Sequence, residues 1–234
     1  MAAEDTVTEA EEDGAFADPA DDPRADYDYV GGDVDRPELV AALAERVDGE
    51  VRFDEHSRRL YATDASAYEV TPVGVVLPRS TADVAAVVDY CADREIPVLP
   101  RGGGTSLAGQ AVNEAVVLDL TTNMGDVLAV DPDERRARVE AGTVLADLND
   151  ALATHDLKFA PDPAAGNRST VGGAVGNNST GAHSLQYGKT DAYVESVEAV
   201  LADGSVERFG EVTVADLRAG RRPGRRPARA DPRG

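Results

Sequence analysis

The sequence is poor in cysteine, tryptophan and lysine, and it has no long apolar run. Its 234 residues include one cysteine, Cys91, and no tryptophan. A single cysteine excludes an internal disulfide framework and an iron–sulfur cluster held only by cysteines of this chain. No apolar run reaches the roughly 18 residues that a membrane-spanning helix needs, and no basic start with an apolar stretch indicates a secretory signal. We therefore predict a cytoplasmic protein without a transmembrane segment.

Positive charge is also scarce. The chain has 23 Lys+Arg against 44 Asp+Glu, which gives a formal net charge of −21, and Lys158 and Lys189 are its only lysines. A polyanion repels phosphate backbones, so we expect no nucleic-acid binding by the bulk of the chain. Few lysines and many carboxylates resemble the composition of halophilic proteins, although GC-rich DNA would give the same preference for arginine.

Charge is distributed unevenly along the chain. Residues 1–35 hold 13 acids and one base, Arg24, with few large apolar residues. Such a segment buries too little apolar surface to fold, so we predict an acidic, disordered leader over 1–35. Residues 218–234 hold seven arginines and one acid, and consist only of Arg, Gly, Pro, Ala and Asp. We predict a disordered Arg-rich tail there and a folded domain over 36–217.

Three interpretations of the tail at 218–234 stay open. It could bind nucleic acid or an acidic partner, or it could be a terminus without function. It could also result from a frameshift, since GC-rich DNA read out of frame gives this mixture of residues. The preceding stretch EVTVADLRA is typical of a helix beginning near Val214, and the composition changes at once after it. We favour the frameshift.

Apolar spacing predicts an α+β fold with two lobes. In the first, over about 36–110, helices and buried strands alternate, and this order implies parallel strands in a small βαβ unit. Cys91 lies on the inner face of its second helix, so we interpret it as a core residue rather than a nucleophile. The expected elements are a helix from Pro37, a strand over 73–77, a helix after the cap-like Ser80 and a strand over 97–100.

The second lobe, over about 111–217, is predicted to be larger and mainly antiparallel. Asp203-Gly204 is typical of a hairpin turn between its last two strands. The strand candidates are 115–119, 127–130, 137–140, 193–201 and 205–209, with a helix over 143–153.

A glycine-rich loop follows the strand at 97–100 directly, and we call it the first glycine loop. Over 100–110 it has the sequence PRGGGTSLAGQ. Consecutive glycines carry no β-carbon, so successive main-chain N–H groups can turn toward one anion, and Thr105 and Ser106 add hydroxyl donors. The loop is a candidate diphosphate cradle. It is neither the dinucleotide fingerprint, because Leu107 replaces the third glycine, nor a P-loop, and a plain flexible loop stays an alternative.

The second glycine loop runs over 161–190. It contains six glycines interleaved with Asn, Ser and Thr. A loop of this length inside a compact domain is usually functional, and this one offers many donors with little bulk. The alternative is a glycine-containing helix packed on the sheet, with Val171, Ala174 and Val175 facing inward.

The order of five motifs resembles the FAD-binding (PCMH-type) domain of the vanillyl-alcohol oxidase / p-cresol methylhydroxylase superfamily. The similarity covers about residues 60–210 and is greatest to the glycolate oxidase / D-lactate dehydrogenase / D-2-hydroxyglutarate dehydrogenase branch. The motifs are VVLPRSTADVAAVVDYC, PVLPRGGGTSLAGQ, VEAGTVLADLNDAL, PDPAAGNRSTVGGAVGNNSTGAHSLQYGKTDAYV and VLADGS.

This resemblance implies a site for FAD. The first glycine loop would supply main-chain donors to the diphosphate, and the second would line the diphosphate and isoalloxazine side. Val194 would contact the adenine or ribose end, and the strand end at 76–78 would pass near the cofactor. The implied cofactor-binding residues are Leu77, Pro78, Arg101, Gly102, Gly103, Gly104, Thr105, Ser106, Gln110, Gly172, Gly173, Gly176, Asn177, Ser179, Gly181, Ala182, Tyr187 and Val194.

Histidines bear on the mode of flavin attachment and on metal binding. Relatives with covalent flavin often carry a histidine in an R-x-G-G-H-S setting, and Thr105 stands at that position, so the resemblance implies non-covalent FAD. His183 is the one histidine within a candidate site, and we interpret it as a hydrogen-bonding loop residue rather than a catalytic group. The other two, His56 and His155, are scattered, so we predict no metal site.

Four hypotheses for function follow. The chain is the FAD-binding portion of an oxidoreductase that oxidises a 2-hydroxy acid, a truncated FAD-binding module without catalysis, an electron-transfer flavoprotein subunit, or an acidic interaction protein. We favour the first, with a small-molecule 2-hydroxy acid as substrate and an electron acceptor or iron–sulfur partner. In the resembled enzymes the acid/base histidine and the carboxylate-binding groups follow the FAD domain, so we assign no catalytic residue here. That later portion would begin near the Arg-rich tail.

Overall fold

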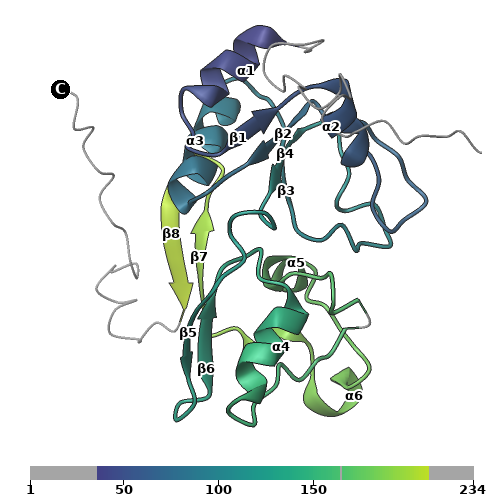
Figure 1. Cartoon of the computed structure of the whole chain (residues 1–234), viewed down its shortest axis with the longest axis vertical. Helices are drawn as coiled ribbons and strands as arrows, with labels where there is room; N and C mark the ends of the chain where they lie inside the picture. The colour runs from purple at the N-terminus through teal and green to yellow at the C-terminus, as the bar shows by residue number, and fades with distance from the viewer. Residues whose placement is uncertain (1–35, 164, 211–234) are drawn as a thin grey trace, which may run out of the picture.

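A computed structural model of the chain describes residues 36–163 and 165–210, and the text below concerns these residues. The predicted acidic leader, the predicted helix from Val214 and the Arg-rich tail lie outside them. The described elements form two lobes, one above the other in Figure 1. Helices and strands are mixed in both, which confirms the predicted α+β class.

The first lobe is built on a four-stranded sheet. Its strand order is β1-β2-β4-β3, with β1 antiparallel to β2, and with β2 and β3 both parallel to β4. Every residue of β2 and β4 is buried, as expected for central strands covered on both faces. The strands are β1 (Glu50–Arg52), β2 (Gly74–Leu77), β3 (Val98–Arg101) and β4 (Val116–Asp119).

Three helices flank this sheet: α1 (Pro37–Ala44), α2 (Glu55–Leu60) and α3 (Thr81–Ala92). Helix α1 begins at the predicted proline. The predicted cap of α3 is confirmed, since the side chain of Ser80 accepts a hydrogen bond from the main-chain N–H of Asp83. Cys91 is fully buried in the apolar core, and burial raises the pKa of its thiol to about 11. Its interpretation as a core residue is thereby confirmed.

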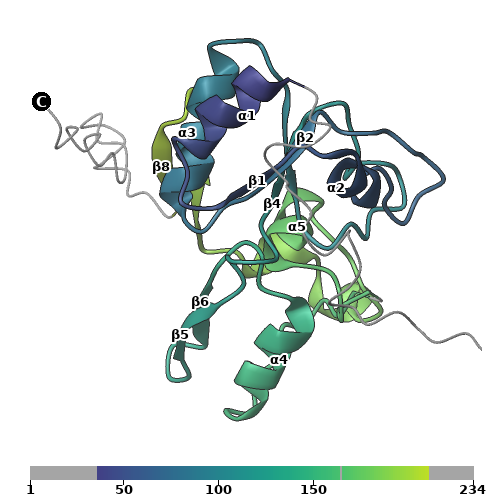
Figure 2. The same ribbon diagram turned by 45° about the horizontal axis from the view of Figure 1, so that its top comes forward.

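The sheet order corrects one expectation about the first lobe. The strand–helix–strand unit is parallel as predicted, but β2 and β3 are not neighbours, because β4 lies beside β2 (Figure 2) and pairs with β3 on its other side. The first sheet therefore extends to Asp119, beyond the boundary near residue 110 that the order along the chain suggested. A crossover connection leaves room for a third strand, and sequence order alone does not reveal it.

The second lobe contains two antiparallel ribbons rather than one larger sheet within the described residues. Strand β5 (Val127–Asp131) pairs with β6 (Arg136–Val139), and β7 (Ser196–Val200) pairs with β8 (Val206–Gly210) through the predicted turn. Arg136 and Glu195 form an ion pair of 2.7 Å between the two ribbons. Helix α4 (Leu145–Ala153) buries Leu145, Leu148 and Leu152 as the spacing predicted.

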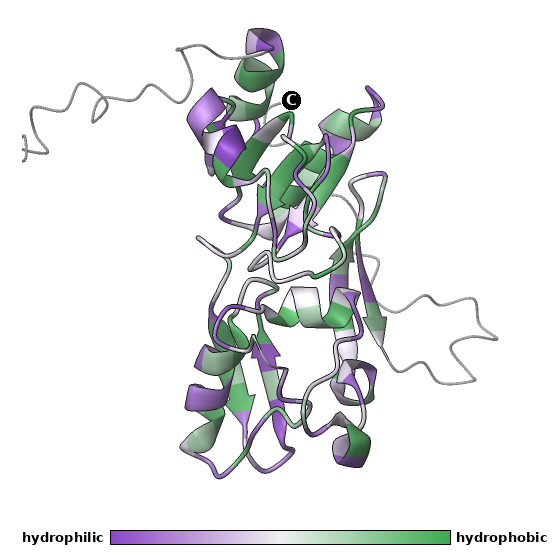
Figure 3. Ribbon diagram, turned by 90° about the vertical axis from the view of Figure 1, so that its right-hand side faces the viewer, coloured by the Kyte–Doolittle hydropathy of each residue, from purple (hydrophilic) through white to green (hydrophobic). Residues whose placement is uncertain are grey.

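The second glycine loop contains three short helical segments. They are α5 (Val171–Gly176), α6 (Ser184–Tyr187) and the 3-10 helix η2 (Thr190–Tyr193). The glycine-containing helix that we kept as an alternative is therefore present over α5, and its Ala174 is buried. Apolar residues concentrate in the strands of the first lobe, whereas the second lobe alternates between apolar and polar residues (Figure 3). In the part of the chain described here, no helix is long and apolar enough to cross a bilayer.

Candidate cofactor site

The first glycine loop begins at the carboxyl end of β3 and packs directly against the second. A β-carbon on Gly103 would stand 1.9 Å from the carbonyl oxygen of Arg168, and one on Gly102 would stand 2.2 Å from Thr170 Oγ1. Thr105 Oγ1 and Ser169 Oγ share a hydrogen bond of 3.0 Å. These contacts require glycine at 102 and 103, because any side chain would push the two loops apart.

The main-chain N–H groups of the first glycine loop are available to a ligand. Within residues 36–163 and 165–210, none of the six N–H groups over 102–107 donates to a protein acceptor. Residues 102–107 are half-buried or exposed, so these N–H groups can be reached by solvent or by a ligand. Consecutive free N–H groups on a glycine-rich turn can bind an anion.

The hydroxyl groups of Thr105 and Ser106 form hydrogen bonds within the protein, whereas we predicted them as donors to a bound anion. The Ser106 hydroxyl donates to Gln110 Oε1 and accepts from the N–H groups of Ala108 and Gln110. Together with the Thr105–Ser169 contact, this means that both hydroxyls hold the loop's own shape. The free donors are therefore main-chain groups.

Arg101 supports the loop from beneath. Its guanidinium donates to three carbonyl oxygens, at 3.1 Å to Tyr61, 2.8 Å to Thr63 and 2.8 Å to Ala111. A β-carbon on Gly104 would stand 2.6 Å from Arg101 Nη2, so the guanidinium lies directly against the loop. Burial lowers the pKa of Arg101, while the nearby Asp119 and Asp64 carboxylates favour its charged form.

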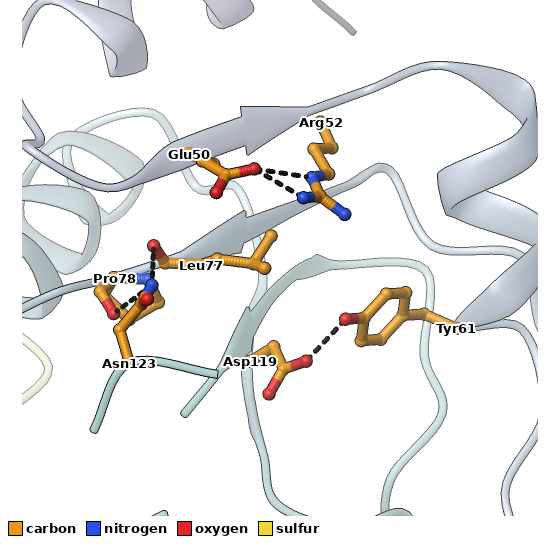
Figure 4. Close-up of polar contacts among 7 residues, drawn as sticks. All are labelled: Glu50, Arg52, Tyr61, Leu77, Pro78, Asp119 and Asn123. Atoms are coloured by element: carbon orange, nitrogen blue, oxygen red, sulfur yellow. Dashed lines mark hydrogen bonds and ion pairs between the residues drawn. The ribbon is translucent and has the colours of Figure 1, made fainter. Parts of the chain in front are cut away.

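Tyr61 and Asp119 complete this support (Figure 4). The Tyr61 hydroxyl donates to Asp119 Oδ2, and Asp119 Oδ1 accepts from the N–H and the hydroxyl of Thr121. Burial raises the pKa of Tyr61 well above its ordinary value, and the hydrogen bond to Asp119 and its charge act in the same direction. The Arg101 guanidinium also lies 5.3 Å from the centre of the Tyr61 ring.

The second glycine loop has most of its N–H groups engaged by its own fold. Thr170 caps α5 by accepting from the Gly173 N–H at 3.2 Å, and the Gly172 N–H donates to the Ala141 carbonyl at 2.8 Å. The N–H groups of Asn177 and Ser179 donate to carbonyls of α5. The main-chain donors of these predicted site residues are thus already used within the protein.

A cavity of about 1230 Å³ lies between the lobes. Its walls come from α3, β3 and β4 of the first lobe and from β5, β6, α5 and β7 of the second. Three predicted site residues line it, Gly172, Gly176 and Val194, whereas residues 101–106 do not belong to its described lining. Nothing lies within 4 Å of a β-carbon built on Gly176, so the fold itself does not require glycine there.

Gly181, Ala182 and Tyr187 form a third group, beside Asp162. A β-carbon on Gly181 would stand 2.0 Å from the Pro161 carbonyl oxygen, and the Ala182 N–H donates to the Asp162 carbonyl. His183 Nδ1 lies 3.4 Å from Asp162 Oδ2. These contacts close the outer turn of the second glycine loop.

Leu77 and Pro78 are buried at the end of β2 (Figure 4). Their carbonyl oxygens lie 3.3 Å and 3.4 Å from Asn123 Nδ2, which ties the end of β2 to the segment after β4. The structure therefore places the predicted site residues in four groups rather than one.

Sequence reasoning missed residues that organise the site from outside the two loops. They are Tyr61, Thr63, Asp119 and Asn123, together with Ser169 and Thr170, which lie inside the second loop but were not selected. A polar residue directly after a buried strand, such as Asp119, is a signal that could have been used, because carboxyl ends of parallel strands gather at one edge. Tyr61 and Thr63 act partly through main-chain carbonyls, for which side-chain chemistry gives no signal.

Comparison with known proteins identifies the family. A model described as an FAD binding domain matches residues 72–210, more than half of the chain. The chain is 36% identical over 196 residues to a D-2-hydroxyglutarate dehydrogenase of Pseudomonas putida, covering 82% of this chain and 19% of that protein. It is 41% identical over 140 residues to a D-lactate dehydrogenase of Archaeoglobus fulgidus, covering 60% of this chain and 31% of that protein. The chain thus spans only a fraction of the length of these relatives.

Solved structures agree on the fold. An alkyldihydroxyacetonephosphate synthase superposes with a TM-score of 0.67 at 23% identity, covering 76% of this chain and 35% of that one. The family predicted from the order of the motifs is confirmed by the matching model and by the relatives. The relatives include dehydrogenases of D-2-hydroxyglutarate and D-lactate, and this chain belongs to the FAD binding domain family.

Proposed function

We propose that this chain holds FAD non-covalently, with the cofactor's diphosphate on the first glycine loop. The observation that carries the proposal is the run of six N–H groups over 102–107 that have no acceptor in the described part of the chain. A diphosphate would supply the missing acceptors. The protein has a net charge of −21, which repels anions. A site built from main-chain N–H dipoles can bind a diphosphate locally without a cluster of basic side chains.

Two further observations support FAD as the ligand. Gly176 has open space where a β-carbon would stand and lines the cavity between the lobes, as expected where a ligand comes close to the main chain. The cavity walls contain many apolar residues, including Val84, Val88, Leu118 and Val175, which suits a flat aromatic ring system. Gly172, Gly176 and Val194 would face that part of the cofactor.

We further propose that this domain belongs to an enzyme that oxidises a 2-hydroxy acid. Bound FAD would supply the two-electron acceptor for a hydride from the carbon that bears the hydroxyl group. The residues of this chain bind and orient the cofactor, and electrons leave to an acceptor or partner outside the chain, because Cys91 alone cannot ligate an iron–sulfur cluster. A cytoplasmic location is part of the same proposal.

FAD titration tests the first part of the proposal. We expect flavin fluorescence to be quenched on binding to the purified chain, and acid precipitation to release all flavin into the supernatant. Flavin that stays on the precipitated polypeptide would refute non-covalent binding. Absence of any saturable quenching by folded protein would refute the FAD site.

Anaerobic reduction tests the second part. The FAD-loaded protein is mixed in turn with D-2-hydroxyglutarate, D-lactate and glycolate, with L-lactate as a control. Bleaching of the visible flavin absorbance by a D-2-hydroxy acid or by glycolate supports an oxidoreductase. FAD binding with no bleaching by any of them supports the alternative, an FAD-binding module that needs the rest of its enzyme.

A further inference from the structure

We infer that the Arg101 side chain is a positioning group that holds the first glycine loop in its ligand-binding shape. This inference rests on the proposed function, because it concerns the same FAD site. Arg101 was predicted only as one residue of the cradle, and its guanidinium has a distinct task.

The guanidinium of Arg101 donates to the main chain of the protein. Its three hydrogen bonds reach carbonyl oxygens at 61, 63 and 111, which belong to two segments on either side of the loop. An arginine fork that satisfies three main-chain carbonyls fixes those segments relative to each other. Three of its five N–H donors are thus used to hold the main chain.

The first glycine loop lies very close to the Arg101 guanidinium. The Gly104 main chain has a φ of +63°, and a β-carbon there would stand 2.6 Å from Arg101 Nη2. The Gly104 carbonyl in turn accepts from the Ala65 N–H at 3.0 Å, which joins the loop to the same segment that Arg101 holds. The shape of the loop over 102–104 therefore depends on where the guanidinium lies.

Arg101 is connected to Tyr61 and Asp119. The Tyr61 carbonyl accepts a hydrogen bond from Arg101, and the Tyr61 hydroxyl donates one to Asp119. Arg101 and Asp119 are register partners on the neighbouring parallel strands β3 and β4. Asp119 is 6% exposed. A buried carboxylate, a tyrosine and an arginine thus form one connected group at the carboxyl edge of the sheet, directly below the free N–H groups.

The inference gives a specific expectation for variants. Lysine keeps the charge of Arg101 but cannot donate to three separated carbonyls, since it lacks the planar fork. We expect Arg101→Lys and Arg101→Gln to weaken FAD binding by about tenfold or more, by similar factors, because misplaced or unsatisfied groups cost that much in affinity. Gly104→Ala should weaken FAD binding in the same way. This variant retains Arg101, but the new methyl group would push the guanidinium out of its position.

Two variants serve as matched controls. Arg94 also donates to a carbonyl, that of Tyr90, and stacks on the Tyr90 ring, but it follows the end of α3 and belongs to neither loop. Gly204 has a φ of +74° and a close contact to Asp89, and it lies in the β7–β8 turn. Arg94→Lys and Gly204→Ala should leave the FAD dissociation constant unchanged. The first removes an arginine hydrogen bond and the second adds a methyl group at a positive φ, but neither residue belongs to the first glycine loop.

The measurement separates positioning from general stability. Dissociation constants for FAD, ADP and adenosine are measured by calorimetry at a temperature where circular dichroism shows each variant folded. A positioning role predicts that affinity for FAD and ADP falls while adenosine, which has no phosphate, is bound as in the wild type. A merely structural role would lower the melting temperature and leave the ratio of ADP to adenosine affinity unchanged, which overturns the inference.

The remaining outcomes are also decisive. Wild-type FAD affinity in Arg101→Lys would show that charge alone suffices and would overturn the inference. If both Arg101 variants fail to fold, Gly104→Ala against Gly204→Ala decides in the same way. If the wild-type protein binds no FAD, the proposed function itself fails, and this result is distinct from a wild-type protein that binds FAD and variants that bind it equally well.

Discussion

The two glycine loops have similar compositions, yet they use their main chains in opposite ways. Over 102–107 the first loop leaves six successive N–H groups without an acceptor in the described part of the chain. In the second loop, by contrast, main-chain N–H groups donate to acceptors within the protein, namely those of Gly172, Gly173, Asn177 and Ser179. Both loops use glycine for close packing, but only the first leaves a run of main-chain N–H groups free for a ligand within the described residues.

The difference has a structural cause. The second loop contains a helix, α5, whose cap and hydrogen bonds consume its donors, whereas the first loop has no regular structure and is held by side chains. Contacts from below, through Arg101, can fix a loop without using its N–H groups. A rigid loop with free donors is preorganised for an anion, and preorganisation reduces the cost of binding.

Gly103→Ala should cause the largest loss of FAD affinity among the variants that test this difference between the loops. The new β-carbon would stand 1.9 Å from the Arg168 carbonyl oxygen, so the first loop must move away from the second. We expect a loss of about 1–3 kcal/mol in the free energy of unfolding, as for other overpacked sites, and a loss of about a hundredfold in FAD affinity. Urea denaturation and FAD titration measure the two effects.

Gly125→Ala is the control for Gly103→Ala, because its β-carbon would make only an ordinary contact, at 3.5 Å. It should behave as the wild type in both measurements. Unchanged FAD affinity in Gly103→Ala would show that the cradle works without its contact to the second loop, and the comparison between the loops would then lose its basis.

Gly176→Ala should separate stability from binding. Since nothing lies within 4 Å of the new β-carbon, alanine fits, and replacing glycine in a helix should add about 0.5–1 kcal/mol to the free energy of unfolding. The same methyl group would occupy the space beside the cavity, so we expect FAD affinity to fall by about tenfold. A variant that is more stable and binds FAD normally would place the cofactor elsewhere.

Thr170→Val tests whether the main-chain N–H groups of the second glycine loop stabilise the fold of that loop. Valine keeps the size of the side chain but removes the oxygen that accepts from the Gly173 N–H. We expect a loss of about 1 kcal/mol in the free energy of unfolding, typical of a lost helix cap, with a smaller effect on FAD affinity. Thr170→Ser keeps the oxygen and should retain most of the stability. An effect of Thr170→Val on binding alone would contradict a structural role.

Patterns in the sequence were sufficient for most elements of the fold. The apolar run of β2, the Ser80 cap and the Asp203-Gly204 turn each depend on local chemistry, and all three are present in the structure. The insertion of β4 between β2 and β3 was not predictable, because strand order depends on how a crossover packs. Likewise, β1 and α2 are short and lack a repeated apolar pattern.

The site was predicted less completely than the fold, for a different reason. Glycine runs reveal where the main chain comes close to something, but they do not say whether that partner is a ligand or the protein itself. Gly103 and Gly181 contact main-chain carbonyls, whereas Gly176 faces open space, and the three look alike in sequence. The support from Tyr61 and Asp119 depends on residues 58 positions apart in the chain, which no local motif contains.

High pH should weaken the support of the first loop. The pKa of Tyr61 is raised in the folded protein, chiefly by burial and then by Asp119. A group whose folded pKa is raised contributes stability that is present below its unfolded pKa, near 10 for tyrosine, and that is lost as pH rises further. We therefore expect the melting temperature to fall above about pH 10, and more steeply in the wild type than in Tyr61→Phe.

Tyr68→Phe is the control for the pH prediction, because the Tyr68 side chain is 61% exposed. It should keep the wild-type slope, whereas Tyr61→Phe should flatten it and cost roughly 1 kcal/mol at neutral pH for one lost hydrogen bond. If all three proteins show the same slope, Tyr61 does not titrate differently on folding. The connected group beneath the first loop would then be held by Arg101 alone, and the contrast with the second loop would rest on one side chain.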